Sequence, residues 1–291
     1  MKISTTTYPY CNAHGTAEAI RLIANAGFDC YDYSVFDISE NNPLYCDGWR
    51  DYIADLRRKA DALGIACNQA HAPFPTSKLP TPANEAYNDT ITDKVIRSME
   101  AASMLGAKAI VVHPKQHLDH WDHIEDHFRI NMEFYRSLAP YAKQFGIKIA
   151  LENMWRTRDG KIVESTCSSA EEFNRYFDTL ADDCFTCCLD LGHCGLTGFK
   201  AEDMIRAMGK RIGTLHVHDN DDFHDSHTLP FNGKMNWEAI TQALGEIGYE
   251  GDFTYETTAY QKKIPDYLMP DALSYMEKMA RRLCEQIDAA R

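Results

Sequence analysis

The chain has 291 residues, of which 44% are hydrophobic, so it is long enough to bury one large core. Its 30 basic and 43 acidic side chains leave a net charge of −13, which argues against nonspecific binding to nucleic acid or to an anionic membrane. No apolar run approaches the roughly 20 residues that cross a bilayer, and no signal peptide is apparent; we therefore expect a cytoplasmic protein with free cysteines.

Strand-like and helix-like segments alternate along the chain. The predicted strands cover residues 2–7, 30–35, 65–69, 109–112, 147–151, 185–189, 212–217 and 252–255. The predicted helices cover residues 15–26, 47–63, 84–105, 122–145, 169–177, 201–208, 237–247 and 270–290. Eight strand–helix units in a chain of this length, with no linker between them, predict an α/β fold: a single-domain (β/α)8 TIM barrel over residues 1–291.

Six consecutive predicted strands, the third to the eighth, end in residue types that bind metals or transfer protons. These residues are His71, His113, Glu152, Asp190, His216 and Glu256. Polar residues often end strands, but that tendency explains one or two such positions rather than six in succession. Because a barrel gathers the carboxyl ends of its strands at one mouth, we expect the six side chains to surround a common centre.

The seventh predicted strand runs into a polar loop, and together they read TLHVHDNDDFHDSH over residues 214–227. We expect this loop, with Asp225 and His227, to form one wall of the active site. His193 follows Asp190 by about one helical turn and is expected at the same mouth. The histidines at 120, 123 and 127 have helical spacing, and we expect them on a solvated helix start rather than in a site.

Three carboxylates and one imidazole suit a hard or borderline divalent ion. We therefore expect Glu152, Asp190, His216 and Glu256 to hold one ion of Mn2+, Mg2+, Co2+ or Zn2+. We expect the remaining candidates to bind the substrate or to complete additional metal sites. Four histidines suit either role: His71, His113, His193 and His227. Asp225 is expected as an additional metal ligand, and Trp155 as part of the substrate-binding wall of the pocket.

Several short motifs resemble the xylose isomerase-like TIM-barrel superfamily, which includes the sugar phosphate isomerases and epimerases. They are HAPF at 71–74, VVHP at 111–114, IALEN at 149–153, CLDLGH at 188–193, HVHDN at 216–220, DSH at 225–227 and GYEGDFTYE at 248–256. The resemblance covers predicted strands three to eight. It implies a metal on Glu152, Asp190, His216 and Glu256, and it implies that His193 hydrogen-bonds a substrate oxygen.

Three branches of this resemblance remain open. The sugar isomerases and epimerases use one ion, whereas the endonuclease IV branch uses three zinc ions on a nine-residue pattern that the chain also matches. The nine positions are His71, His113, Glu152, Asp190, His193, His216, Asp225, His227 and Glu256. The loop NMWRTRDG at 153–160 and the acidic composition favour the sugar branch. A third alternative is a subunit of a C-glycoside-cleaving lyase. Ketose 3-epimerases of the superfamily resemble each other in an arginine six residues after the histidine of the seventh strand. This chain has Asp222 at that position, so it departs from the pattern of those enzymes.

The expected reaction is isomerisation or epimerisation of a small-molecule sugar by proton transfer through a metal-bound enediolate. Glu152 and Glu256 are the expected catalytic acid and base, because they come from strands on opposite sides of the barrel. The presence of both carboxylates argues against a sugar-binding barrel without catalysis. The sequence does not determine the oligomeric state, and a homo-oligomer is among the possible states.

Overall fold

The computed structural model describes residues 1–116 and 118–291. Eight parallel strands form a sheet in the order β10-β1-β2-β3-β4-β5-β8-β9. They are β1 (Ile3–Thr6), β2 (Cys30–Ser34), β3 (Ala66–His71), β4 (Ala109–Val112), β5 (Lys148–Glu152), β8 (Phe185–Asp190), β9 (Ile212–His216) and β10 (Phe253–Tyr255). The two end strands meet where the Val217 amide donates to the Thr254 carbonyl at 2.9 Å, so the sheet closes into the predicted barrel.

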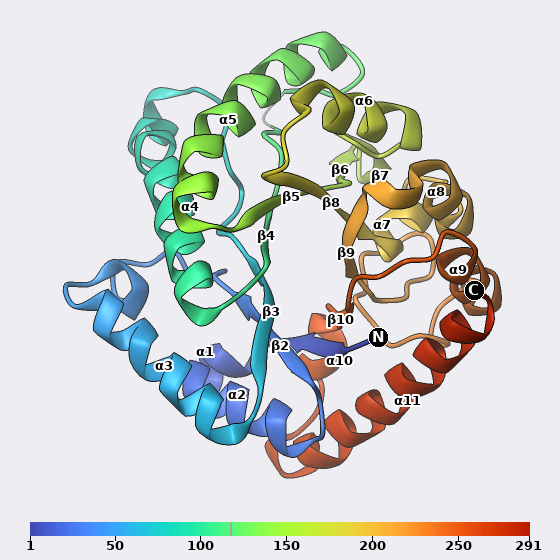
Figure 1. The fold of residues 1–291 in the computed structure, drawn as a ribbon. Helices are drawn as coiled ribbons and strands as arrows, with labels where there is room; N and C mark the ends of the chain where they lie inside the picture. The colour runs from blue at the N-terminus through green and yellow to red at the C-terminus, as the bar shows by residue number, and fades with distance from the viewer. Residues whose placement is uncertain (117) are drawn as a thin grey trace.

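Helices surround this barrel on its outer side (Figure 1). They are α1 (Tyr10–His14), α2 (Thr16–Asn25), α3 (Trp49–Leu63), α4 (Glu85–Leu105), α5 (Ile124–Phe145), α6 (Ala170–Leu180), α7 (Leu191–Leu196), α8 (Ala201–Met208), α9 (Trp237–Glu246), α10 (Thr258–Lys262) and α11 (Met269–Ala289). Short 3₁₀ segments lie at Pro43–Tyr45, Pro82–Asn84, Gly209–Arg211 and Asp266–Leu268. The main hydrophobic core lies between the sheet and this helical layer.

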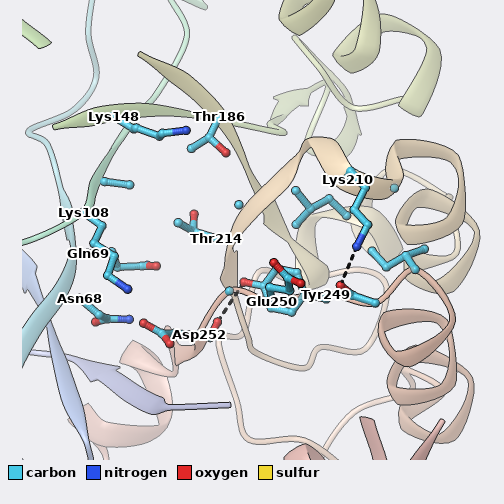
Figure 2. Close-up of a pocket in the computed structure, with 17 residues that line it drawn as sticks. Asn68, Gln69, Lys108, Lys148, Thr186, Lys210, Thr214, Tyr249, Glu250 and Asp252 are labelled. Carbon is cyan, nitrogen blue, oxygen red and sulfur yellow. Dashed lines mark hydrogen bonds between the residues drawn. The ribbon is translucent and has the colours of Figure 1, made fainter. Parts of the chain in front are cut away.

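The barrel interior has a different composition from that outer core. Its apolar part is a small cluster of four buried residues, Ala109, Val111, Ala150 and Cys188. Small side chains at these positions leave room along the barrel axis for the larger polar groups at both ends. At the amino-terminal mouth lies a cavity of about 410 Å³ that is lined by Gln69, Lys148, Thr186 and Thr214, among others (Figure 2).

A β-hairpin replaces the loop that we expected after the fifth barrel strand. Strands β6 (Trp155–Arg158) and β7 (Lys161–Glu164) pair antiparallel. Asp159 and Gly160 connect them with φ of 51° and 74°, the left-handed conformations of a tight hairpin turn. The hairpin begins at Trp155 beside the carboxyl end of β5 and therefore extends from the carboxyl-terminal mouth of the barrel.

The expectation that the histidines at 120 and 127 lie on a solvated helix start is wrong. His120 is only 3% exposed and His127 is fully buried, and their rings stack with centroids 6.0 Å apart. The cause is tertiary: Arg156 on the hairpin hydrogen-bonds the Leu118 carbonyl, and His120 Nε2 lies 3.7 Å from the Glu172 carboxylate on α6. Helix α5 accordingly begins at Ile124 rather than at residue 122.

The ten cysteines are all free thiols, as expected. Among residues 1–116 and 118–291, no helix combines the length and the apolar composition that crossing a membrane requires.

Candidate active site

The six strand-end residues lie together at the carboxyl-terminal mouth of the barrel. Each side chain lies at the end of its strand or directly after it, and parallel strands with matched registers bring these ends to the same level. Five of the six are buried and His113 is 13% exposed: His71 2%, Glu152 1%, Asp190 0%, His216 0% and Glu256 7%. The structure thus brings the six side chains to one mouth, where their ligand atoms fall into overlapping groups.

The four residues expected to hold one ion form a compact group. One ligand atom from each of Glu152, Asp190, His216 and Glu256 lies within 4.8 Å of the others. His216 Nδ1 is the central atom, 2.7 Å from Glu152 Oε1, 3.4 Å from Glu256 Oε2 and 3.9 Å from Asp190 Oδ2. Such spacing lets a single cation reach all four side chains after small shifts.

The electrostatics of this group fit a divalent cation. Three carboxylates are buried within a few ångströms of one another, and like charges at this separation repel strongly in a low-dielectric interior. Burial alone would raise the pKa of Glu152, but the imidazoles of His216 and His113 outweigh burial and hold that pKa well below its ordinary value. A bound cation of charge +2 would compensate the remaining negative charge, as the donor set requires.

A second group shares Glu152 and lies beside the first. His71, His113 and Glu152 each offer a ligand atom within 4.8 Å of the others. His113 Nε2 lies 2.9 Å from Glu152 Oε2 and 3.1 Å from His71 Nε2. Phe36 and Phe74 pack edge-on against the His71 ring at 4.9 and 5.3 Å, which fixes the orientation of that imidazole.

A third group also adjoins the first and includes a residue that the sequence analysis missed. His193, His218, Asp225 and His227 form it. His218 Nε2 lies 3.0 Å from Asp190 Oδ1, and its ring stacks on His227 with centroids 4.0 Å apart. His218 follows His216 by two positions, and this spacing on an extended segment was the signal that places both at one mouth.

Asp225 and His227 form a close pair within that third group. Their carboxylate oxygen and Nε2 are 3.0 Å apart, and both residues are less than one-fifth exposed. Burial alone would lower the pKa of His227, but the Asp225 carboxylate outweighs burial and raises that pKa to about 10. The Asp225 carboxylate thus favours the protonated form of His227 as long as no ion is bound between them.

The three groups line or underlie one small cavity. Its volume is about 250 Å³, and its lining consists of His71, Phe74, Pro75, His113, Gln116, Glu152, Met154, Trp155, His193, Asp225, His227 and Glu256. Trp155 reaches it from the hairpin, with its ring 6.4 Å from that of His193. Asp190 and His216 lie below this lining, fully buried. Within the described ranges, neither a lysine nor an arginine contributes to this wall.

The closed barrel and the strand-end cluster define a TIM-barrel protein with a candidate metal centre at its carboxyl-terminal mouth. The chain belongs to the xylose isomerase-like TIM barrel family, whose model matches residues 20–279. The match spans all barrel strands except β1, so it covers every element that carries a candidate ligand.

Two curated relatives illustrate the sequence similarity. The uncharacterized protein MJ1311 of Methanocaldococcus jannaschii is 27% identical over 240 residues, which cover 81% of this chain and 77% of the relative. The inosose isomerase of Bacillus subtilis is 26% identical over 174 residues, which cover 57% of this chain and 59% of that protein.

Solved structures share the complete fold. A D-tagatose 3-epimerase-like protein superimposes with a TM-score of 0.76 and 20% identity, and the match covers 99% of both chains. The IOLI protein, solved with a bound zinc atom, superimposes with a TM-score of 0.72 and 19% identity over 100% of this chain and 99% of the other. At these identities the likeness concerns the fold.

Proposed function

We propose that this protein is a divalent-metal-dependent isomerase or epimerase acting on a small, uncharged sugar or sugar derivative. The observation that carries the proposal is the position of Glu152 and Glu256. Their carboxylate oxygens belong to the same four-residue donor group and lie within 4.8 Å of each other, and both side chains line the cavity. Two carboxylates that face one cavity are the arrangement needed to remove a proton from carbon and return it.

In this proposal Glu152, Asp190, His216 and Glu256 hold the ion, which when bound would act as a Lewis acid on a substrate carbonyl. One glutamate removes the proton from the carbon next to that carbonyl, and the other delivers a proton. Delivery of the proton to the opposite face of the same carbon epimerises the sugar. Delivery to the neighbouring carbon instead interconverts an aldose and a ketose. His193, which is 5% exposed at the cavity wall, would hydrogen-bond a sugar hydroxyl.

The character of the cavity wall supports an uncharged substrate. A phosphate or carboxylate group normally meets arginine or lysine in its site, and the described part of this wall has neither. Phe74 and Trp155 instead offer apolar ring faces of the kind that pack against the C–H faces of a sugar. A volume of about 250 Å³ accommodates a ligand of monosaccharide size. The inosose isomerase among the relatives acts on a molecule of this class, according to its name.

The proposal is tested by hydrogen exchange at carbon. The protein is loaded with Mn2+ and incubated in D2O with a panel of neutral aldoses, ketoses and inososes, and NMR follows the incorporation of deuterium. We expect exchange at one carbon next to the carbonyl, lost in Glu256→Gln and in Glu152→Gln but retained in Glu250→Gln, an exposed control at the opposite mouth. Exchange that survived both active-site variants would contradict the proposal.

A second candidate function is zinc-dependent cleavage at abasic sites in DNA. The observation in its favour is that the three donor groups share one mouth and together contain the nine residues of the endonuclease IV-like pattern. The net charge of −13 and the cavity wall without described lysine or arginine count against it. Three zinc ions per chain together with nicking of an abasic duplex would replace the first proposal with this one.

A further inference from the structure

Asp32 is a buried carboxylate below the candidate metal centre that the proposed reaction does not use. It lies on β2 and is 1% exposed, inside the barrel. Its Oδ2 atom is 3.9 Å from Nε2 of His216, on the side of that imidazole away from Glu152. His216 therefore lies between two carboxylates, with Nδ1 toward the donor group and Nε2 toward Asp32.

The burial of Asp32 has a cost that its contacts do not offset. Oδ2 accepts a hydrogen bond from Gln69 Nε2 at 2.8 Å, whereas Oδ1 is buried without a hydrogen-bond partner among residues 1–116 and 118–291. An isosteric amide would avoid the penalty for burying charge, so the carboxylate has no evident role in stability.

The chemistry of a histidine ligand supplies such a role. An imidazole that binds a cation uses the lone pair of one nitrogen and carries its proton on the other nitrogen. In His216 the nitrogen facing the donor group is Nδ1, which lies 2.7 Å from Glu152 Oε1, whereas Nε2 is buried without a hydrogen-bond partner among the described residues. An ion bound at Nδ1 would therefore place the proton on Nε2. A carboxylate that accepts this proton in a hydrogen bond fixes the tautomer, orients the ring and strengthens the ligand.

We propose that Asp32 is the positioning carboxylate of the metal centre, which holds the His216 proton on Nε2 and so keeps Nδ1 directed at the ion. The separation of 3.9 Å is about 1 Å longer than a hydrogen bond, so the proposal requires the two side chains to approach each other by about that distance when the ion binds. This inference rests on the proposed metal centre, but it does not depend on which reaction that centre performs.

Gln69 completes the arrangement from below. Its amide donates to Asp32 Oδ2, and the same residue lines the cavity at the amino-terminal mouth, where it is labelled near Asn68 and Lys108 (Figure 2). The hydrogen bond holds the Asp32 carboxylate in one orientation inside the barrel. A row of neighbouring side chains thus connects the cavity at the amino-terminal mouth with the candidate metal centre, through Gln69, Asp32 and His216.

The test compares metal affinity with stability in three full-length proteins: wild type, Asp32→Asn and the control Asp29→Asn. Asp29 precedes β2 and is ion-paired with Arg281 at 2.7 Å, at the far end of the strand from the centre. Zn2+ affinity is measured by competition with a chromophoric chelator, and the free energy of unfolding is measured by urea denaturation in EDTA. We expect Asp32→Asn to weaken Zn2+ binding roughly 10–100-fold without loss of stability in EDTA. Asp29→Asn should lose stability and keep the wild-type affinity.

Two further measurements keep the inference testable if Asp32→Asn folds poorly. Gln69→Met removes the donor to Asp32 and should lower Zn2+ affinity several-fold. In the Zn2+-loaded wild type, 15N NMR of the histidines should show the His216 proton on Nε2. The inference is overturned if Asp32→Asn, or Gln69→Met in its place, binds Zn2+ within about twofold of wild type, or if the proton is absent from Nε2.

The outcomes also separate this inference from the proposed function. A wild type that bound no divalent ion would contradict the metal centre, and the inference would fall with it. A large difference in affinity between wild type and Asp32→Asn, in a protein that exchanges no sugar proton, would support the role of Asp32 and contradict the sugar reaction alone.

Discussion

At the scale of single residues, Gly192 leaves no space for a side chain beside the His218 ring. A Cβ built on Gly192 would lie 2.0 Å from Cε1 of the His218 ring, a separation that no real contact shows. His218 is fully buried and contacts Asp190 at 3.0 Å. Any side chain at residue 192 must therefore displace the His218 imidazole, which contacts the candidate metal ligand Asp190.

We predict that Gly192→Ala destabilises the protein by roughly 1–3 kcal/mol, the usual cost of overpacking a well-packed interior. The penalty should largely disappear when His218→Ala removes the ring. Urea denaturation of the two single variants and the double variant gives the coupling energy between the positions. Equal penalties for Gly192→Ala in both backgrounds would show that the imidazole is not the obstacle.

At the scale of elements, the strand ends were predictable because each apolar run stops at a charged or imidazole side chain, as Leu151 does before Glu152. Helix α7 was not predicted, because six residues are too few to show a periodicity; it begins where Asp190 accepts a hydrogen bond from the His193 amide. The burial of His120 was not predictable either, because it depends on contacts with the distant hairpin and α6.

The hairpin β6–β7 shows where a local signal existed and was overlooked. The dipeptide Asp159-Gly160 is a strong hairpin signal, and it separates two short segments with strand character. Their basic and exposed side chains resembled a loop, because the hairpin has no fully buried face to produce alternation. The placement of the candidate ligands at the strand ends could be predicted from the sequence. The grouping of His218 with His193, Asp225 and His227 could be recognised only from the folded structure.

Helix α6 contains a carboxylate whose titration should appear in the stability of the whole protein. Burial raises the pKa of Glu172 from its ordinary value of 4.5 to about 7. Folding thus favours the protonated form: the stabilising effect is complete below about pH 4.5 and is lost as the pH rises through 7. Between these values the free energy of unfolding should fall by at most about 1.4 kcal/mol per pH unit.

The prediction is that Glu172→Gln reduces this decline, because the amide does not titrate. Urea denaturation at intervals across this pH range measures the slope for each protein. Glu171→Gln, an exposed neighbour on the same helix, is the matched control and should keep the wild-type slope. A slope that is unchanged in Glu172→Gln would assign the pH dependence to another group.

At the scale of the whole molecule, the barrel brings together side chains from residues 71 to 256 that have no local relation in sequence. The free energy of folding must overcome the repulsion among three buried carboxylates before any ion binds. Ion binding and folding should consequently be coupled, because the unfolded chain does not preserve the four-residue group.

We predict that a divalent ion at about 100 times its dissociation constant stabilises the protein by about 2.7 kcal/mol, and that EDTA reverses the effect. Thermal denaturation with and without the ion measures the change. Asp190→Asn should lose most of this stabilisation, because it removes a charged ligand from the group. Asp203→Asn, a 70% exposed acid on α8, is the control and should respond like wild type.

The central claim is that one ion is held by the four strand-end residues, and a crystal structure of the Mn2+-loaded protein with anomalous scattering tests it most directly. The account predicts one strong anomalous peak within about 2.0–2.4 Å of ligand atoms from Glu152, Asp190, His216 and Glu256. Three peaks of comparable height, one in each donor group, or no peak among these four residues would contradict it.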